Sequence, residues 1–480
     1  MSTSRREFLY LSGSALAAAS AMGRPQEALA HGAGPMRPAN LPWRASVTDA
    51  TRKFAPQPAQ PWSVTPSAGA DAVRVEPHKR YQQIEGFGGA FTDAACWVIH
   101  QLPEAERAAL LHELFHPSAM GLSVCRTCIG SSDYSRSVYS FDEGEPDPEM
   151  KRFTVDHDRD YILPVLQQAR QVNPGLYLFS SPWSPPGWMK GNRSMLGGAM
   201  QRKSMPAYAR YFVKFLQAYA EAGVPVQAVT VQNEVDTEQD GQMPACAWPQ
   251  EYEADFVRNF LGPALKQAGI KTEIWLIDHN YNLWGRAISE LETPGVRDYA
   301  HTIAWHGYVG DVAWIDRVSQ AFPDVSMRWT EGGPDYTDPN YHTDWTKWSS
   351  TFTGILRHGC ASITAWNLAL DEQGKPNLGP FPCGGMVSVD SRTREVAYSG
   401  QYHGMAHFSR TIRRGAHRIS SESDAKDLDH CAFVNSNGES VVVLTNRGKA
   451  RTCDLHAGTS IARVELPENS VVTVSWDEQR

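Results

Sequence analysis

The stretch AVTVQNE, residues 228–234, is a short apolar, β-prone run that ends in a carboxylate, Glu234. A second run of the same kind, VSMRWTEGG at residues 325–333, carries Glu331 in the corresponding place. In barrels of parallel strands, the chemistry lies at the C-terminal ends of the strands. The two runs therefore predict two carboxylates on different strands that face each other at one end of a barrel.

The region around these runs alternates β-prone segments with amphipathic helices, which is typical of parallel βα units. A clear helix is predicted by the aromatic and apolar residues that recur at helical spacing over 208–219, before Gly223 and Pro225. Eight candidate strands occur near residues 84–88, 122–129, 176–181, 226–232, 273–277, 302–305, 325–330 and 362–366. Eight units favour a closed barrel, so the predicted fold is α/β, a (β/α)8 TIM barrel.

The pattern changes after about residue 410, where short strands and turns replace helices. We expect an appended β-sandwich that is built from these C-terminal strands and completed by an N-terminal strand near residues 72–76. The predicted boundaries are a signal peptide at 1–30, a linker with the N-terminal strand or strands at 31–80, the catalytic barrel at 81–410 and the sandwich at 411–480.

The N-terminus has the features of an export signal. Residues 4–9, SRREFL, match a twin-arginine signal, a moderately apolar stretch follows, and residues 28–30, ALA, form an A-x-A cleavage site. No other segment is apolar over the length that a bilayer requires, so no stable membrane span is expected. These features predict a bacterial protein that is periplasmic or secreted.

Composition excludes some functional classes. The chain has 480 residues, of which 41% are hydrophobic and 20% charged, and a formal net charge of -8. This is an ordinary globular composition without the basic face that nucleic-acid binding needs. The eight cysteines are irregularly spaced, and the C-x-x-C at 125–128 lies inside a predicted strand without a second pair. We expect mostly buried thiols rather than a zinc site, with one or two disulfides left open.

Most predicted barrel strands end in polar or aromatic residues. One such residue would usually cap a loop, but eight ends that converge on one face indicate a site. Two carboxylates across such a site are the minimum equipment for hydrolysing a glycosidic bond. Arg126, in the second strand, could point into the same cavity and keep a carboxylate ionised, although a structural arginine fits equally well.

Several longer stretches resemble glycoside hydrolase family 30. They are IEGFGGAFTDA (84–94), SPWSPPGWMK (181–190), RYFVKF (210–215), QNE (232–234), AWNLAL (365–370) and YHGMAHFS (402–409). The resemblance implies a (β/α)8 barrel with a β-sandwich and a reaction that retains the anomeric configuration. It implies Glu234 as the acid/base and Glu331 as the nucleophile.

The resemblance also implies the residues that contact the sugar. With Arg126 added from the argument above, the expected substrate-binding residues are Asp93, Arg126, Trp183, Asn233, His306, Tyr308 and Trp366. The family often has proline after the acid/base, whereas Val235 stands here. The loop after this strand, which helps to shape the aglycone side, is therefore expected to differ.

The sequence thus predicts a retaining β-glycoside hydrolase that cleaves β-glucosyl linkages, similar to a glucosylceramidase or β-glucosidase. The alternatives are a β-1,6-glucanase, β-xylosidase or β-fucosidase and, outside this class, a non-catalytic carbohydrate-binding protein. A metal hydrolase is disfavoured because Asp278, His279 and His306 lack a ligand spacing such as H-E-x-x-H. The expected partner is a carbohydrate or glycolipid substrate. Trp248 or Trp284 could contact a lipid, although burial in the core fits both residues better. No metal, cofactor, nucleic acid or protein partner is predicted.

Overall fold

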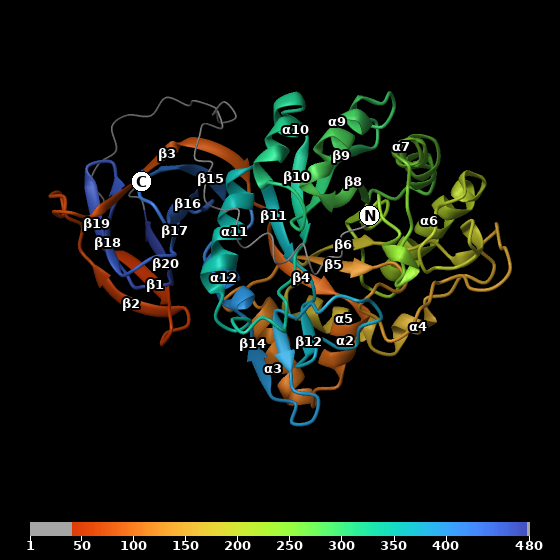
Figure 1. Ribbon diagram of the computed structural model, residues 1–480, viewed down its shortest axis with the longest axis horizontal. Helices are drawn as coiled ribbons and strands as arrows, with labels where there is room; N and C mark the ends of the chain where they lie inside the picture. Colours follow the sequence, from red (N-terminus) through yellow and green to blue (C-terminus); the bar gives the residue numbers. More distant parts are fainter. Residues whose placement is uncertain (1–40, 478–480) are drawn as a thin grey trace.

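The computed structural model describes residues 41–477. The predicted signal peptide lies outside the described residues. A closed barrel of eight strands and a large antiparallel-rich sheet lie side by side, and helices α11 (Trp345–Arg357) and α12 (Gly400–Ser409) lie between them (Figure 1). Within the described part of the chain, none of the helices combines the length and the apolar character that a membrane crossing requires.

The barrel confirms the predicted fold class. Its strands follow one another in parallel in chain order: β4 (Gly86–Phe91), β5 (Val124–Cys128), β6 (Tyr177–Ser181), β7 (Ala228–Thr230), β8 (Glu273–Asn280), β9 (Ala300–His306), β10 (Ser326–Glu331) and β11 (Cys360–Ala365). Each of them overlaps or adjoins one of the eight predicted runs. Strand β4 needs its glycines, because a Cβ on Gly88 would lie 1.7 Å from the Val124 carbonyl oxygen of β5.

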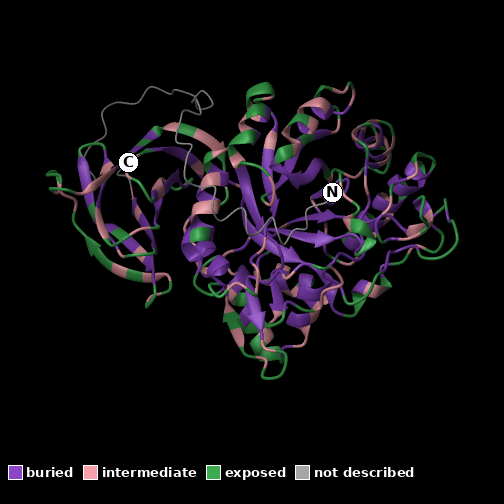
Figure 2. Cartoon of the chain, in the orientation of Figure 1, coloured by how far each residue is buried: buried purple, intermediate pink, exposed green. Residues whose placement is uncertain are grey.

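Helices cover the outside of the barrel. They are α2 (Asp93–His100), α3 (Glu104–Phe115), α4 (Asp156–Arg159), α5 (Ile162–Val172), α6 (Met205–Glu221), α7 (Gln250–Phe256), α8 (Gly262–Gln267), α9 (Trp284–Glu292) and α10 (Asp316–Ala321), with α11 and α12. The predicted helix over 208–219 is α6, which buries the face carrying Tyr208, Phe212 and Phe215. Exposed residues gather on the outer faces of these helices, and the strands beneath are buried (Figure 2).

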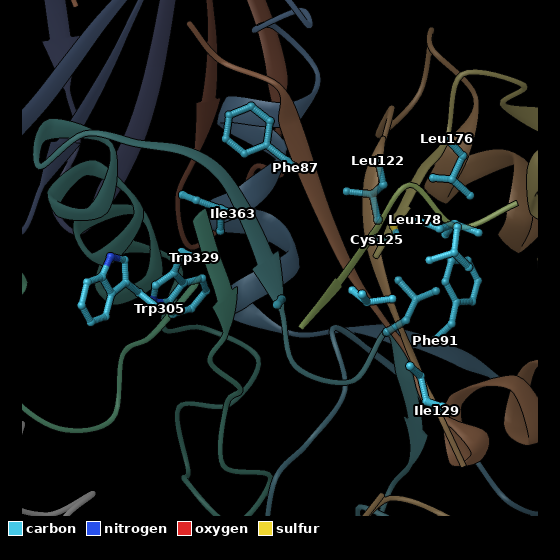
Figure 3. Packing of buried hydrophobic residues seen from close by; sticks show 14 of the residues in the cluster. Phe87, Phe91, Leu122, Cys125, Ile129, Leu176, Leu178, Trp305, Trp329 and Ile363 are labelled. Atoms are coloured by element: carbon cyan, nitrogen blue, oxygen red, sulfur yellow. The ribbon is translucent and has the colours of Figure 1, made fainter. Parts of the chain in front are cut away.

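The main apolar core lies between the strands and the surrounding helices. Figure 3 shows part of this core, which includes Phe87, Cys125, Leu178, Trp305 and Trp329. All eight cysteines lie in the described part of the chain, are buried and form no disulfide. The prediction of buried thiols is confirmed, and the bridges that the spacing left open do not form.

The barrel interior is arranged in layers. One layer is apolar: Val124, Phe179, Ala228, Trp275 and Ala304. Side chains on a strand alternate between its two faces. On each strand, the next residue that points into the barrel is therefore two positions further along, and it belongs to the next layer along the barrel axis. On four of these strands this residue is polar: Arg126, Ser181, Thr230 and His306. The polar layer therefore lies at the end of the barrel where the strands finish, and the apolar layer fills the barrel beneath it.

The second domain takes three strands from the N-terminal segment, where the sequence predicted one or more. Its strands pair in the order β19-β18-β3-β15-β16-β17-β20-β1-β2. Three of them precede the barrel: β1 (Trp43–Thr48), β2 (Ala55–Gln60) and β3 (Asp71–Gln83). The others follow it: β15 (His417–Glu422), β16 (Leu428–Val434), β17 (Glu439–Asn446), β18 (Arg451–Ala457), β19 (Ser460–Leu466) and β20 (Ser470–Asp477). These strands enclose a separate apolar core.

A third, small sheet follows the last barrel strand. It contains β12 (Ala369–Asp371), β13 (Val387–Val389) and β14 (Val396–Tyr398). Its long connection carries Phe381 and Cys383, which pack against Trp366 and Trp183 at the end of the barrel. This connection therefore forms part of the wall around the strand ends.

Candidate active site

Glu331 ends strand β10 and is held from two sides. Arg126 Nη1 donates to its Oε2 over 2.6 Å, and the Tyr308 hydroxyl donates to its Oε1 over 3.0 Å. The residue is 3% exposed. A buried carboxylate with a charged donor on one oxygen and a neutral donor on the other has a single orientation, as a nucleophile requires.

Arg126 connects the ends of several strands. Its guanidinium is fully buried and also donates to Asp278 Oδ2 over 2.7 Å and to Asn233 Oδ1 over 2.8 Å. Burial disfavours the charge, but the carboxylates of Asp278 and Glu331 outweigh this effect and raise the pKa of Arg126. The structure thus brings Arg126 into the cluster, with Asn233 beside it.

Asp278 is the buried centre of this network; the sequence placed it at the end of a barrel strand but not among the expected catalytic or substrate-binding residues. Burial raises its pKa, but Arg126 and His306 outweigh burial and hold the pKa far below the usual value. Its two oxygens accept from five donors, namely Arg126 Nη2 (2.7 Å), Ser181 Oγ (2.8 Å), Thr230 Oγ1 (2.7 Å), Thr330 Oγ1 (2.7 Å) and His306 Nε2 (3.0 Å).

A β-bulge turns Asp278 inward. Regular alternation would place Ile277 in the polar layer, two residues after Trp275. Instead, Ile277 and Asp278 have φ values of 75° and 45°, and the register with β9 shifts between Ile277 and His279. A positive φ is rare for a β-branched residue and marks a conformation that its surroundings impose. Because of the bulge, both Asp278 and His279 point into the site.

The bulge is held from outside the barrel. The Ile277 N–H donates to Glu253 Oε1 over 2.9 Å, and Arg286 Nη2 donates to the other oxygen of this carboxylate over 2.7 Å. Glu253 lies on α7 and Arg286 on α9, so two helices fix the backbone of β8. Side chains of helices outside the barrel therefore determine which side chains of β8 reach the site.

Glu234 follows strand β7 and lies across His306 from Glu331. It is 5% exposed, its φ is 53°, and its Oε2 accepts from Gln239 Nε2 over 2.8 Å. Its Oε1 lies 3.5 Å from His306 Nδ1, while His306 Nε2 lies 3.8 Å from Glu331 Oε2. The two glutamates therefore approach opposite nitrogens of one imidazole ring.

His306 carries a proton at neutral pH. Burial lowers its pKa, but the charge of Glu331, the hydrogen bond to Asp278 and the nearby Glu234 carboxyl outweigh burial and raise the pKa to about 9. The cluster therefore contains two cations, Arg126 and His306, among its carboxylates. A protonated imidazole between the two glutamates can respond to a change of charge on either of them.

Two tryptophans form an aromatic wall beside the carboxylates. The rings of Trp183 and Trp366 stack with centroids 5.0 Å apart, and Arg126 Cζ lies 4.6 Å from the Trp183 ring. Tyr134 packs edge-on against Trp366 at 6.0 Å, and its hydroxyl donates to the Phe381 carbonyl. Aromatic faces next to polar groups suit the apolar faces and hydroxyls of a sugar ring.

Asp93 is held by neighbours of its own beside the aromatic wall, since the next residue, Ala94, donates its N–H to the Tyr134 carbonyl. Asp93 begins helix α2, where the Tyr161 hydroxyl donates to its Oδ2 over 2.7 Å and the Arg136 N–H donates to its Oδ1 over 2.9 Å. Each carboxylate oxygen can still accept a second hydrogen bond, so the expected sugar contact of Asp93 stays a prediction. Asp133 lies next to Tyr134 in the wall, and its carbonyl accepts from the Leu378 N–H.

Residues 41–477 contain one group of side chains with the spacing of a cation site. Glu234, His279 and His306 each offer an atom, and these atoms lie within 4.8 Å of one another. His306 holds a proton at neutral pH, which a cation bound there would have to displace.

A closed parallel barrel with two facing carboxylates, a bridging cationic network and an aromatic wall defines a glycoside hydrolase site. Comparison with known families agrees. Residues 84–412 match the TIM-barrel domain of glycosyl hydrolase family 30, and residues 415–474 match its β-sandwich domain. The chain belongs to glycosyl hydrolase family 30, as its motifs indicated.

The relatives of this chain differ from one another in the activity that their names state. The chain is 34% identical over 391 residues to an endo-1,6-β-D-glucanase of Neurospora crassa, covering 77% of this chain and 80% of that protein. It is 29% identical over 444 residues to a putative glucosylceramidase of Caenorhabditis elegans, covering 86% and 85%. The solved structure of an endo-β-1,6-glucanase superposes with a TM-score of 0.83 at 27% identity, covering 91% of this chain and 100% of that one.

Proposed function

We propose that this glycoside hydrolase cleaves β-1,6-glucosidic linkages with retention of configuration, outside the cytoplasm. The observation that carries the proposal is the pair Glu234 and Glu331 on opposite sides of His306, in a barrel similar in sequence to an endo-1,6-β-D-glucanase. Similarity to a second such enzyme among solved structures supports the same substrate. The sequence alone favoured a glucosylceramidase-like activity, and the comparisons support the β-1,6-glucanase alternative better.

In the first step, a Glu331 oxygen attacks the anomeric carbon, the glycosidic C–O bond breaks, and the Glu234 proton moves to the departing oxygen. A covalent glycosyl-enzyme results. In the second step, water attacks the same carbon and gives a proton to Glu234, and the Glu331 carboxylate leaves. Protons balance over the cycle, so no exchange with solvent is required.

The position of His306 suits the change of Glu234 from an acid in the first step to a base in the second. In the free enzyme, the negative charge of Glu331 favours a protonated Glu234, while the His306 cation 3.5 Å away favours the ionised form. Once Glu331 is an ester its charge is gone, and His306 then favours the carboxylate that acts as base. The same cation can thus support both steps.

Glucosylceramide is the second candidate substrate, because the putative glucosylceramidase of C. elegans matches over most of its length. The two tryptophans considered as lipid contacts differ in their exposure. Trp248 is 1% exposed in the main core and cannot reach a lipid chain, whereas Trp284 is half-buried with Arg317 Cζ 4.6 Å over its ring. Only Trp284 remains a candidate contact.

The test is a rate panel on the purified protein with β-1,6-glucan, glucosylceramide and aryl β-glucoside, β-xyloside and β-fucoside. We expect cleavage of β-1,6-glucan with the β-anomer as first product. Glu331→Gln and Glu234→Gln should stay folded and lose most turnover. Glu234→Gln should keep first-step rate on dinitrophenyl glucosides, whose leaving groups need no proton.

Three outcomes would contradict the proposal. Near-native activity of Glu331→Gln would remove the nucleophile assignment, and an equal loss on all leaving groups would remove Glu234 as the acid. Sugar binding without turnover, unchanged in both variants, would favour a carbohydrate-binding protein. An unchanged rate in excess chelator is expected as well, and a loss of rate there would favour a metal hydrolase.

A further inference from the structure

Glu234 shares one imidazole with a second carboxylate from its own turn. The chain passes through a left-handed conformation at Glu234 (φ 53°) and returns toward strand β8. Asp236 Oδ1 then lies 2.5 Å from His279 Nε2, and Glu234 Oε1 lies 3.8 Å from His279 Nδ1. The bulge in β8 points His279 into this space. The sequence element Glu234-Val235-Asp236 therefore encloses the ring of His279 from two sides.

The proton on His279 can be placed from its neighbours. The Asn280 amide is oriented by its Oδ1, which accepts from the N–H groups of Tyr308 (2.9 Å) and Val309 (3.1 Å). Its Nδ2, which can only donate, lies 3.3 Å from His279 Nδ1. Nδ1 is therefore an acceptor, and the ring proton is on Nε2, where Asp236 accepts it.

We propose that Asp236 and His279 are positioning residues that keep Glu234 protonated for the first step; the inference rests on the proposed role of Glu234 as the acid. With its proton on Nε2, His279 has no proton on the Nδ1 that lies 3.8 Å from Glu234 Oε1, so the ring gives no hydrogen bond to an ionised Glu234. The negative charge of Asp236 behind the ring opposes ionisation of Glu234 as well.

Asp236 has the charge that this role needs. Burial raises the pKa of Asp236, but the hydrogen bond from His279 outweighs burial and holds that pKa below its usual value. Its side chain is 42% exposed, so the pair lies between Glu234 and solvent. Asp236 is two residues from Glu234 and is much more exposed. The exposed Asp236 is suited to holding a charge, and the buried Glu234 is suited to releasing a proton.

The other charged groups around Glu234 come from four neighbouring strands and one helix. The His306 cation of β9 favours ionisation and the Glu331 carboxylate of β10 opposes it, while Arg126 of β5 and Asp278 of β8 are paired with each other. Arg286 of α9 acts on Asp236. These groups act on Glu234 in both directions, and the charge of Asp236 adds to those that oppose its ionisation.

The experiment compares pH profiles of Asp236→Asn and the wild type. Asparagine can still accept from Nε2 but removes the charge. On β-1,6-linked oligosaccharides, we expect the basic limb of kcat/KM to move about one unit lower, which is about a tenfold loss at a pH on that limb. On dinitrophenyl glucosides kcat/KM should not change, because the first step then needs no acid. His279→Gln should shift the oligosaccharide profile in the same direction.

The matched control is Asp240→Asn, which removes one charge from an exposed position of the same loop. It should reproduce the wild-type profile. Superimposable profiles for Asp236→Asn and the wild type would overturn the inference, and so would an equal shift in Asp240→Asn, which would indicate a general charge effect.

A second readout does not depend on turnover. In ¹⁵N-histidine spectra, with the His279 signal assigned by its loss in His279→Gln, we expect a proton on Nε2 that redistributes in Asp236→Asn. A proton on Nδ1 in the wild type would overturn the inference. A wild type without activity on any substrate would instead contradict the proposed function, while the spectra would still test the contacts of His279.

Discussion

Asp278→Asn should lower the stability and the turnover of this protein more than the near-identical shapes of the two side chains suggest. Two of the five donors to Asp278 are fixed N–H groups on different oxygens, Arg126 Nη2 on Oδ2 and His306 Nε2 on Oδ1. The three hydroxyl donors can rotate, but these two cannot. An asparagine has a single oxygen, so in either orientation its NH₂ group faces one of the two N–H groups.

Both orientations carry a cost. With NH₂ toward Arg126, a buried guanidinium loses its charged acceptor. With NH₂ toward His306, the ring must give up the Nε2 proton, and the ion pair between β8 and β9 is lost. Removing one partner of a buried ion pair costs about 3–5 kcal/mol. At about 2 °C per kcal/mol for a large domain, the Tm should fall by roughly 6–10 °C.

Calorimetry and steady-state kinetics on an aryl β-glucoside would measure the two effects. We expect kcat to fall on the order of 10²-fold, since Arg126 and His306 both orient the glutamates. Thr230→Val is the graded control, because it removes one neutral donor to the same carboxylate and should cost about 1 kcal/mol. A Tm for Asp278→Asn within 2 °C of the wild type, or equal to that of Thr230→Val, would refute the reasoning.

Two further predictions concern the interface between the domains and the thiols. His407 is buried between the hydroxyls of Thr48 and Thr473, and burial lowers its pKa to about 3. The unfolded chain binds this proton first, so stability should fall as the pH drops from about 6.5 toward 3, and a His407→Gln variant should show a smaller fall in Tm over that range. Because all eight cysteines are buried and unbridged, a thiol reagent should label none in the native protein and eight in denaturant, and reductant should leave Tm unchanged; labelling of fewer than eight would indicate a bridge.

The sequence by itself was sufficient for the barrel and for the two glutamates. Strands, helix faces and the carboxylates at strand ends depend on local periodicity and on contiguous motifs, which can be recognised without knowing what packs against them. The aromatic wall was predictable for the same reason, since Trp183 and Trp366 each end a predicted strand. The eight strands in their parallel order followed from the alternation of elements.

The rest was decided by contacts between distant residues. Alternation alone would place Ile277 in the polar layer, and only the Glu253 carboxylate on α7 and the register with β9 exchange it for Asp278. Asp93 lies in a motif of the family, but its partner Tyr161, 68 residues further along the chain, could not be read from that motif. Strand propensity likewise identifies single strands but not their partners, so the number of N-terminal strands in the second domain appeared only when the chain was folded. Local pattern fixes which elements form, whereas the direction of an individual side chain depends on neighbours that sequence order does not reveal.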